Sequence, residues 1–390
     1  MKLGIEDISL ATTSLVLDLD EVAAAQGADP DKFRIGIGQD SMSIPAPDED
    51  VVTLGAQAAQ RVLHGQDLSA IRTVLFATES GVDQSKSAGV YMHRLLGLNP
   101  NARVIEFKQA CYSGTGALQL ALALVARNPE QKVLVVAADI ARYDAGSSGE
   151  PTQGAAAVAM LISATPDVLA IEPVSGLYTQ DIMDFWRPNY RSTAIVDGRY
   201  SIKAYLDSVK QSWRDYRAQG GHELSEFDHF CYHQPFTRQA VKGHATLARE
   251  GGVDAETRDA QLEHTLDYNR VLGNSYTASL YVGLLSLLDS SPDDLTGHRI
   301  GFFSYGSGAV GELFAGVVQP GYRTRSHRTE HRAAIDGRTP IDYARYFELH
   351  ERPDDVDGGD HPRERGTTGP FRFAGVRDHG RVYEPTSAGA

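Results

Sequence analysis

Three titratable side chains of complementary chemistry stand where apolar stretches of the sequence end, and Cys111 is the first of them. It lies in K-Q-A-C-Y-S-G-T-G-A-L, between a strand-like stretch, 103–107, and an apolar helical stretch, 117–125. A thiol at such a corner faces the free N–H groups of the following helix, which together with the helix dipole favour the thiolate. Cys111 is therefore a candidate nucleophile, and the alternative is a small buried hydrophobic residue.

The other two side chains are a carboxylate and an imidazole. Glu79 ends R-T-V-L-F-A-T-E-S, and His233 lies in F-C-Y-H-Q-P-F, just before a helix that we expect to begin at Thr237. Ligands of open α/β sheets bind at the carboxyl ends of the strands, so these groups could meet Cys111 in one pocket. There they would supply a base and an acid to covalent chemistry. Taken singly, Glu79 could instead cap a helix, and His233 could be structural.

Two further features suit the same chemistry. Glycines in Y-G-S-G, 305–308, follow an apolar strand and would let backbone N–H groups point at a developing oxyanion, although an ordinary tight turn has the same composition. Arg238 and Lys242 lie four residues apart on one helix face, which suits the phosphates of a long anionic substrate. The alternative for this pair is a solvated surface.

A metal site at H-x-C-x-H is a weaker interpretation. His229, Cys231 and His233 alternate at strand spacing and could share one face. The spacing is not that of the familiar zinc sites, and Cys231 is more simply explained as a residue that packs inside. We predict no metal site.

Strand-like and helical patterns alternate along the chain, which predicts an α/β fold. A second series of such elements begins near residue 167. We therefore predict two similar halves, 1–166 with Glu79 and Cys111, and 167–390 with His233. From about residue 321 the composition shifts to Arg, Asp, His, Gly and Pro, which predicts an irregular tail with a loop over 350–370. We expect this tail to wrap over the surface, and a lid over the site is the weaker alternative. The helices expected in the second half cover 201–213, a stretch from 237, and 276–288.

Bulk properties exclude several classes of protein. With 390 residues the chain can bury a large core, and its formal net charge of −14, without a basic run, argues against nucleic acid as a partner. Two distant cysteines give no disulfide framework, which suits a reducing compartment. The N-terminus lacks the apolar stretch of a signal peptide, and no window is long enough to span a membrane. We expect a cytoplasmic protein.

Several motifs in order and spacing carry a family resemblance. They are K-Q-A-C-Y, A-T-E-S, Y-H-Q-P-F, M-D-F-W-R-P-N-Y from Met183, G-N-S-Y-T-A-S-L-Y from Gly273, and S-Y-G-S-G. Together they resemble 3-hydroxy-3-methylglutaryl-CoA (HMG-CoA) synthase of the bacterial type over nearly the whole chain. The resemblance implies a thiolase-like fold of two stacked α/β halves with an αβαβα core, a homodimer, and no metal or organic cofactor. It also implies condensation of acetyl-CoA with acetoacetyl-CoA in the mevalonate pathway of isoprenoid synthesis.

The resemblance assigns roles to individual residues. Cys111 would take the acetyl group, Glu79 would remove a proton from its methyl carbon, and His233 would polarise and protonate the C3 carbonyl of acetoacetyl-CoA. Contacts with the substrates would come from Tyr143, Thr152, Ser201, Arg238, Lys242, Asn274 and Ser307.

Three rival functions differ in what they require of the sequence. A decarboxylating β-ketoacyl synthase of the same fold needs no carboxylate base, so Glu79 argues against it. A β-branching synthase that takes its acetyl group from an acyl carrier protein tends to lose D-F-W-R-P-N-Y and N-S-Y-T-A-S, both of which this chain retains. A sensor that only binds acyl-CoA would not need the intact trio.

Overall fold

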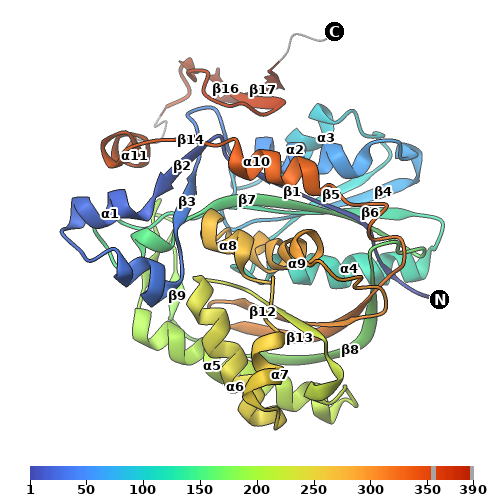
Figure 1. The fold of residues 1–390 in the computed structure, drawn as a ribbon. Coiled ribbons are helices and arrows are strands. Elements are labelled where there is room, and N and C mark those ends of the chain that lie inside the picture. Colours follow the sequence, from blue (N-terminus) through green and yellow to red (C-terminus); the bar gives the residue numbers. More distant parts are fainter. Residues whose placement is uncertain (353–356, 387–390) are drawn as a thin grey trace.

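A single nine-stranded mixed sheet runs through the molecule (Figure 1). The computed structural model describes residues 1–352 and 357–386. In spatial order the strands are β11 (His229–Tyr232), β12 (Arg299–Gly306), β13 (Val310–Val318), β8 (Leu169–Thr179), β1 (Gly4–Thr12), β7 (Ala155–Ser163), β6 (Lys132–Ile140), β4 (Ile71–Ala77) and β5 (Arg103–Phe107).

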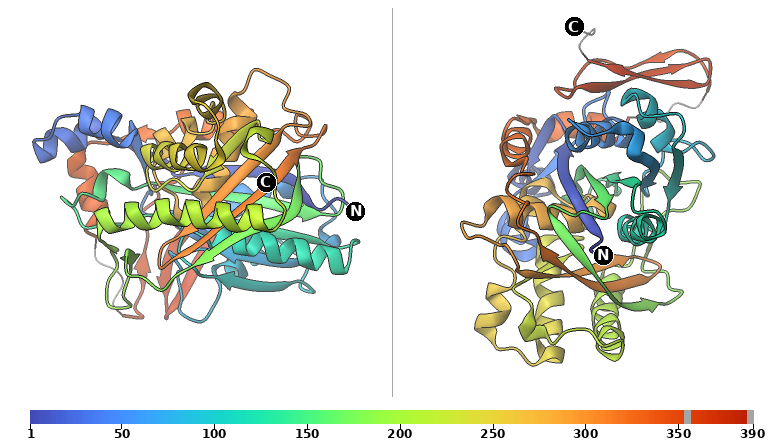
Figure 2. Two further views of the ribbon diagram at one scale, coloured as in Figure 1. Left: turned by 90° about the horizontal axis from the view of Figure 1, so that it is seen from below. Right: turned by 90° about the vertical axis from the view of Figure 1, so that its right-hand side faces the viewer.

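The sheet is divided into two halves at the junction of β1 and β8. Only two residue pairs join these strands, whereas β1 pairs with β7, and β8 with β13, over most of their lengths. The two halves fold over one another, so that helices lie between them as well as outside them (Figures 1 and 2). The expected boundary at 166–167 falls between β7 and β8.

Alternation along β7 shows how the layers form. Ala156, Val158, Met160 and Ile162 face a central core, and the residues between them face an outer core. Because both faces of β7 are buried, its sequence is a continuous apolar run rather than an alternating one. Layers of helix must therefore cover both sides of each half-sheet.

The helices supply those layers. The central layer contains α4 (Ser113–Arg127), α8 (Asp267–Leu272) and α9 (Ser279–Ser290). One outer layer contains α2 (Val51–Leu63) and α3 (Ala88–Leu95), and the other contains α5 (Gly198–Ala218) and α6 (Thr237–Gly251). Figure 2 shows α5 across the outer face of the C-terminal half-sheet. This α-β-α-β-α order confirms the predicted layered fold.

Smaller elements complete the chain. They are α1 (Leu19–Gln26), β2 (Leu15–Asp18), β3 (Ser41–Ile44), the pair β9 (Phe185–Trp186) and β10 (Ile195–Val196), and α7 (Ala255–Ala260). Within the described residues, no helix is both long enough and apolar enough to cross a membrane.

The expectation of an irregular tail from about residue 321 is wrong. The segment contains α10 (Arg328–Asp336), β14 (Thr339–Pro340), α11 (Tyr343–His350), β15 (His361–Pro362), β16 (Phe371–Arg377) and β17 (Gly380–Pro385). Three aromatic residues, Phe371, Phe373 and Tyr383, are spaced among charged ones and pack into the outer core beside α2, which is why a polar composition still forms strands. Of the loop expected over 350–370, residues 353–356 lie outside the described part.

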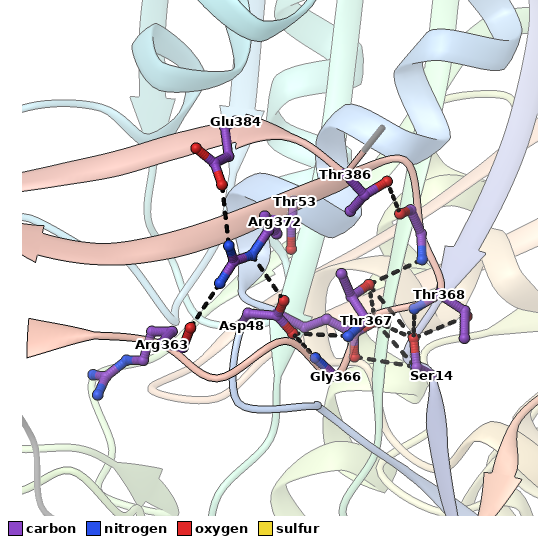
Figure 3. Close-up of polar contacts among 12 residues, drawn as sticks. Ser14, Asp48, Thr53, Arg363, Gly366, Thr367, Thr368, Arg372, Glu384 and Thr386 are labelled. Carbon is purple, nitrogen blue, oxygen red and sulfur yellow. Dashed lines mark hydrogen bonds and ion pairs between the residues drawn. The ribbon is translucent and has the colours of Figure 1, made fainter. Parts of the chain in front are cut away.

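A buried ion pair ties this tail to the N-terminal half (Figure 3). The fully buried carboxylate of Asp48 accepts hydrogen bonds from the backbone N–H groups of Gly366 and Thr367 at 3.0 and 2.8 Å. The same carboxylate pairs with Arg372 at 3.1 Å, and Arg372 also contacts Glu384. Because the side-chain partners of Asp48 in the described part of the chain all come from the tail, the tail is an integral part of the N-terminal half.

Candidate active site

Cys111 lies in a tight corner between β5 and α4. Ala110, just before it, has a φ of 43°, a left-handed conformation that costs a non-glycine residue on the order of 1–3 kcal/mol. Ser113 holds the corner, because its hydroxyl oxygen accepts from the backbone N–H of Gln109 and its O–H donates to the carbonyl of Ala110. The corner thereby directs the side chain of Cys111 into the interior, where it is buried.

Glu79 follows β4 and is held through its backbone by Asp139 at the end of β6. The carboxylate of Asp139 accepts hydrogen bonds from the N–H groups of Glu79 and Ser80, both at 2.9 Å, and from the hydroxyl of Thr78 at 2.8 Å. Its second oxygen accepts from the N–H and hydroxyl of Thr277. Asp139 is a residue that the sequence reading missed, although an acidic residue in the apolar run K-V-L-V-V-A-A-D was a usable signal.

The side chains of Cys111 and Glu79 meet directly. The Sγ atom donates a hydrogen bond to Oε1 of Glu79 at 3.0 Å. Burial and the neighbouring charge of Asp139 raise the pKa of Glu79 to about 8, against the opposing effects of the Cys111 hydrogen bond and the Arg187 charge. A carboxyl group with such a pKa both holds and releases a proton near neutrality, as a general acid–base group must.

The expectation that the α4 N-terminus favours the thiolate of Cys111 is wrong. Burial raises the pKa of the thiol well above its usual value, and the carboxylates of Glu79, Asp139 and Asp184 raise it further. The helix offers less compensation than expected, because the N–H groups of Thr115 and Gly116 already donate to the carbonyl of Tyr112. At rest the site therefore holds a thiol, and Glu79 is placed to accept its proton.

Aromatic side chains wall the space beside Cys111. Tyr143, Phe185 and Tyr276 pack with Cys111 in one apolar cluster, and Phe185 contacts the two tyrosine rings edge-on at centroid distances of 5.9 and 5.7 Å. Phe185 belongs to the M-D-F-W-R-P-N-Y motif and Tyr276 to N-S-Y-T-A-S. Both motifs thus contribute to the buried, aromatic surroundings of the thiol.

The glycine-rich turn after β12 closely approaches the Cys111 corner. A Cβ at Gly306 would lie 2.4 Å from the carbonyl oxygen of Gln109, so only glycine permits this contact. The Gln109 amide donates to the carbonyl of Ser307 at 3.2 Å, and the Asp184 carboxylate accepts from the N–H of Gly308 at 2.9 Å. The turn that carries Ser307 is therefore held against the segment that carries the thiol.

A second close backbone contact brings Asn274 next to Thr152. The N–H of Asn274 donates to the carbonyl of Thr152 at 3.0 Å. A Cβ at Gly273, whose φ is 80°, would lie 1.9 Å from the carbonyl oxygen of Gln153. The side-chain oxygen of Asn274 accepts from the N–H of Tyr276 at 2.9 Å, which leaves the side-chain NH₂ as a donor.

His233 directly follows β11 and is buried in a less polar setting. Its backbone N–H donates to Phe303, and its carbonyl accepts from the hydroxyl of Tyr205 at 2.8 Å. The ring Nδ1 lies 2.6 Å from the Oγ of Ser279. Burial lowers the pKa of His233 to about 3, so the imidazole is neutral at physiological pH.

The start of α9 links the two sets of residues. Thr277 is bonded to Asp139, beneath Glu79, and Ser279, two residues later, is bonded to His233. One short segment therefore sets the separation of the carboxylate corner and the imidazole corner.

The remaining predicted contacts lie on the surface, in an outer layer and, for Thr152, in a buried turn. Arg238 and Lys242 are exposed on the first turns of α6, and neither has an ion-pair partner in the described part of the chain. Ser201 is partly buried in the first turns of α5, which meets α6 at Tyr205 and Gly243. Thr152 is buried and donates its hydroxyl proton to the carbonyl of Gly149.

Metal-ligating side chains do not converge at the H-x-C-x-H segment. Among the described residues, no three or more His, Cys, Asp or Glu side chains lie so that they could hold a metal ion. Cys231 packs into the central core, and burial raises the pKa of its thiol.

A layered thiolase-like fold with a thiol, a carboxyl group and an imidazole at the ends of its strands defines an acyl-transferring condensing enzyme. Family models described as hydroxymethylglutaryl-coenzyme A synthase match the chain, the N-terminal one over residues 1–169 and the C-terminal one over 169–261 and 250–351. The chain belongs to the HMG-CoA synthase family.

Individual relatives support this. A hydroxymethylglutaryl-CoA synthase of Enterococcus faecalis is 42% identical over 92% of this chain and 94% of its own. A polyketide biosynthesis 3-hydroxy-3-methylglutaryl-ACP synthase of Bacillus subtilis is 33% identical over 81% of this chain and 80% of its own. Among solved structures, an HMG-CoA synthase complexed with CoA superposes with a TM-score of 0.95 at 39% identity and covers 99% of this chain and 100% of that one.

Proposed function

We propose that the protein condenses acetyl-CoA with acetoacetyl-CoA and water to give HMG-CoA and CoA, through an acetyl group carried on Cys111. The observation that carries this proposal is the 3.0 Å contact of the Cys111 thiol with Glu79, beside a cluster of aromatic side chains that packs against the thiol. Membership of the family and the relative from Enterococcus support the same reaction.

In the first half-reaction Cys111 attacks the thioester carbonyl of acetyl-CoA. The thiol proton passes to the Glu79 carboxylate as the new C–S bond forms. Glu79 then gives this proton to the departing CoA sulfur, so that CoA leaves as a thiol and Glu79 is ionised again. Because Glu79 is already the hydrogen-bond acceptor of the thiol, this transfer needs no rearrangement.

In the second half-reaction the ionised Glu79 removes a proton from the acetyl methyl group. The resulting enolate attacks C3 of acetoacetyl-CoA, whose carbonyl oxygen is polarised by a hydrogen bond from His233. That oxygen becomes a hydroxyl group by taking up the proton that Glu79 removed from the methyl group. Water then cleaves the thioester to Cys111, which restores the thiol and releases HMG-CoA. Stabilisation of the oxyanions would come from the Asn274 NH₂ and the Ser307 N–H. Ser307 lies on the turn held against the Cys111 corner, and Asn274 is bonded to Tyr276 of the cluster that contains Cys111.

Binding of the CoA arm is proposed for the residues along α5 and α6. Arg238 and Lys242 are exposed cations without ion-pair partners in the described chain, as a phosphate site requires before its ligand arrives. Near the start of α6, the buried side chains of Gln39 and Gln239 have no hydrogen-bond partner among the described residues. Tyr143 would line the acyl pocket, and Ser201 and Thr152 would contact the pantetheine arm.

We also propose a homodimer that acts in the cytoplasm, in the mevalonate pathway. β5 is the outermost strand of the sheet on its side, and Ile105 on β5 and Leu120 on α4 are 45% and 49% exposed. An open strand edge with apolar side chains can pair with a second copy of itself. Both cysteines are free thiols, which fits a reducing compartment.

The test separates the two half-reactions with Glu79→Gln. Wild-type protein should gain an acetyl group from acetyl-CoA, seen by intact mass, and then produce HMG-CoA, seen by chromatography. The variant should become acetylated more slowly, on long incubation at saturating acetyl-CoA, because the amide cannot accept the thiol proton. Once acetylated, it should condense about 10²–10⁴-fold more slowly than acetylated wild type, the usual effect of losing a general base. The rate at which the acetyl methyl protons exchange with deuterated solvent should fall together with the rate of condensation.

A matched control is Glu106→Gln, because Glu106 is also a partly buried carboxylate with a raised pKa but only caps α3 through the N–H of Ala88. It should behave as wild type. Normal condensation in Glu79→Gln would refute the assigned base. Acetylation of the wild type by an acetyl carrier protein but not by acetyl-CoA would favour the β-branching reaction.

A further inference from the structure

Ser279, the first residue of α9, is fully buried and touches the catalytic imidazole from behind. Its Oγ lies 2.6 Å from Nδ1 of His233 and 3.1 Å from the backbone nitrogen of Gln234. These two contacts, both to residues that directly follow β11, fix the hydroxyl between a ring nitrogen and a backbone N–H group.

The donors and acceptors at this position allow one arrangement of protons. The N–H of Gln234 can only donate, so it uses a lone pair of the Ser279 oxygen. The single hydroxyl proton then needs an acceptor, and within the described residues Nδ1 of His233 is the one in hydrogen-bonding contact with Oγ. Nδ1 therefore carries a lone pair, and the proton of the neutral ring lies on Nε2.

The opposite arrangement leaves a proton without a partner. If Nδ1 were protonated, in the other neutral tautomer or in the imidazolium, it would donate to an oxygen that already accepts from Gln234. The hydroxyl proton of Ser279 would then point at no acceptor in a buried site, which is unfavourable. Burial, which lowers the pKa of His233, acts in the same direction.

We propose that Ser279 is a positioning residue that holds His233 as the neutral tautomer with its proton on Nε2. This inference rests on the proposed function in one respect, namely that Nε2 faces the C3 oxygen of acetoacetyl-CoA. His233 then acts in condensation as a fixed hydrogen-bond donor to that oxygen, and it is unsuited to remove a proton from the acetyl group or from Cys111. Glu79 is left as the base of both half-reactions.

The direct test reads the tautomer in the wild-type protein by ¹⁵N NMR with labelled histidine. The His233 signals are identified by their loss in His233→Asn. We expect one protonated and one unprotonated nitrogen at pH 7, with the proton on Nε2. Observation of the proton on Nδ1, or of both nitrogens protonated, would overturn the proposal without bearing on the overall reaction.

Kinetics of Ser279→Ala provide the second test. Without the hydroxyl, both neutral tautomers become accessible, and a lone pair on Nε2 would repel the carbonyl oxygen. We expect acetylation of Cys111 within about twofold of wild type, condensation slower by roughly 10–100-fold, and a mixture of tautomers in the NMR spectrum. Ser279→Thr, which keeps the hydroxyl, should recover most of the rate and the single tautomer.

The matched control is Ser286→Ala on the same helix. Ser286 is also fully buried, but its hydroxyl donates to the backbone carbonyl of His264, away from the site. It should leave both half-reactions and the His233 signals unchanged. Equal loss in Ser286→Ala and Ser279→Ala would mean that disruption of α9 explains the effect and would refute the positioning role. Failure of wild type to form HMG-CoA would instead refute the proposed function while the tautomer remained measurable.

Discussion

The corner of Cys111 and the corner of His233 lie at strand ends in different halves of the molecule, yet their surroundings differ sharply. Cys111 is in contact with the carboxyl group of Glu79, and Asp139 lies behind that group. His233 is hydrogen-bonded through its ring to the hydroxyl of Ser279, and burial alone accounts for its lowered pKa. One corner is rich in acidic groups, and the other has a neutral setting.

Burial disfavours charge in both corners, but with different consequences. It raises the pKa of the acids Cys111 and Glu79 and lowers the pKa of the base His233, so each group tends towards its neutral form. In the N-terminal half, a proton can move between sulfur and carboxylate over 3.0 Å. In the C-terminal half, the proton stays on the ring. Similar folds thus provide a site of proton transfer and a site of fixed hydrogen bonding.

The largest expected effect removes the N-terminal corner entirely. Cys111→Ala should abolish acetylation by acetyl-CoA and HMG-CoA formation, because no other thiol contacts a proton acceptor at the pocket. The control is Cys231→Ala, since Cys231 packs in the central core and has no carboxylate beside it. Intact mass after incubation with acetyl-CoA measures both. An acetyl group on Cys231 in the first variant would show that the comparison between the corners is wrong.

The fold could be predicted where the sequence signal is local. Strands buried on both faces are continuous apolar runs, and the helix expected from Thr237 begins there as α6. The helix expected over 201–213 extends over Gly198–Ala218, and that over 276–288 starts with a 3-10 turn, Tyr276–Ala278, before α9. The tail was mispredicted because its strands depend on pairing and on distant contacts such as that of Arg372 with Asp48.

The sequence predicts the family of the protein more completely than it predicts the residues of the site. Motifs identify Glu79, Cys111 and His233 as candidates, and the structure brings the first two into contact. Asp139 and Ser279 were not recognised from the sequence, because their importance depends on hydrogen bonds to residues 60 and 46 positions away. The raised pKa of Cys111 could not be predicted for the same reason, since the carboxylates that disfavour the thiolate come from other segments of the chain.

The pH dependence of condensation should sharpen the contrast between the corners. Glu79 accepts protons only when ionised, so the rate should rise about tenfold per pH unit below its pKa of about 8 and level off above it. The rate at pH 6 would then be roughly a hundredfold below the plateau. His233, with a pKa of about 3, should add no further change between pH 5 and pH 9. Initial rates in constant-ionic-strength buffers measure this.

A fall in rate above pH 8, with the protein still folded by circular dichroism, would contradict the fixed-donor role of His233. The residual activity of Glu79→Gln should no longer rise with pH up to about 8. That result would assign the rise in the wild-type rate to ionisation of Glu79.

The smallest expected effects concern the exposed cations of α6, which bind substrate but touch no reacting atom. Arg238→Ala or Lys242→Ala should raise KM for the CoA thioesters by roughly 3–10-fold, about 0.7–1.4 kcal/mol, and leave kcat nearly unchanged. A phosphate contact is equally strong in the ground state and the transition state, so its loss weakens binding without slowing chemistry. Added salt should diminish the difference from wild type, because exposed charges are screened.

Arg249→Ala, at the far end of the same helix, is the control, since Arg249 is bonded to its own helix at the carbonyl of Ala245. If all three variants keep the wild-type KM, Arg238 and Lys242 are surface residues, and the CoA phosphates bind elsewhere.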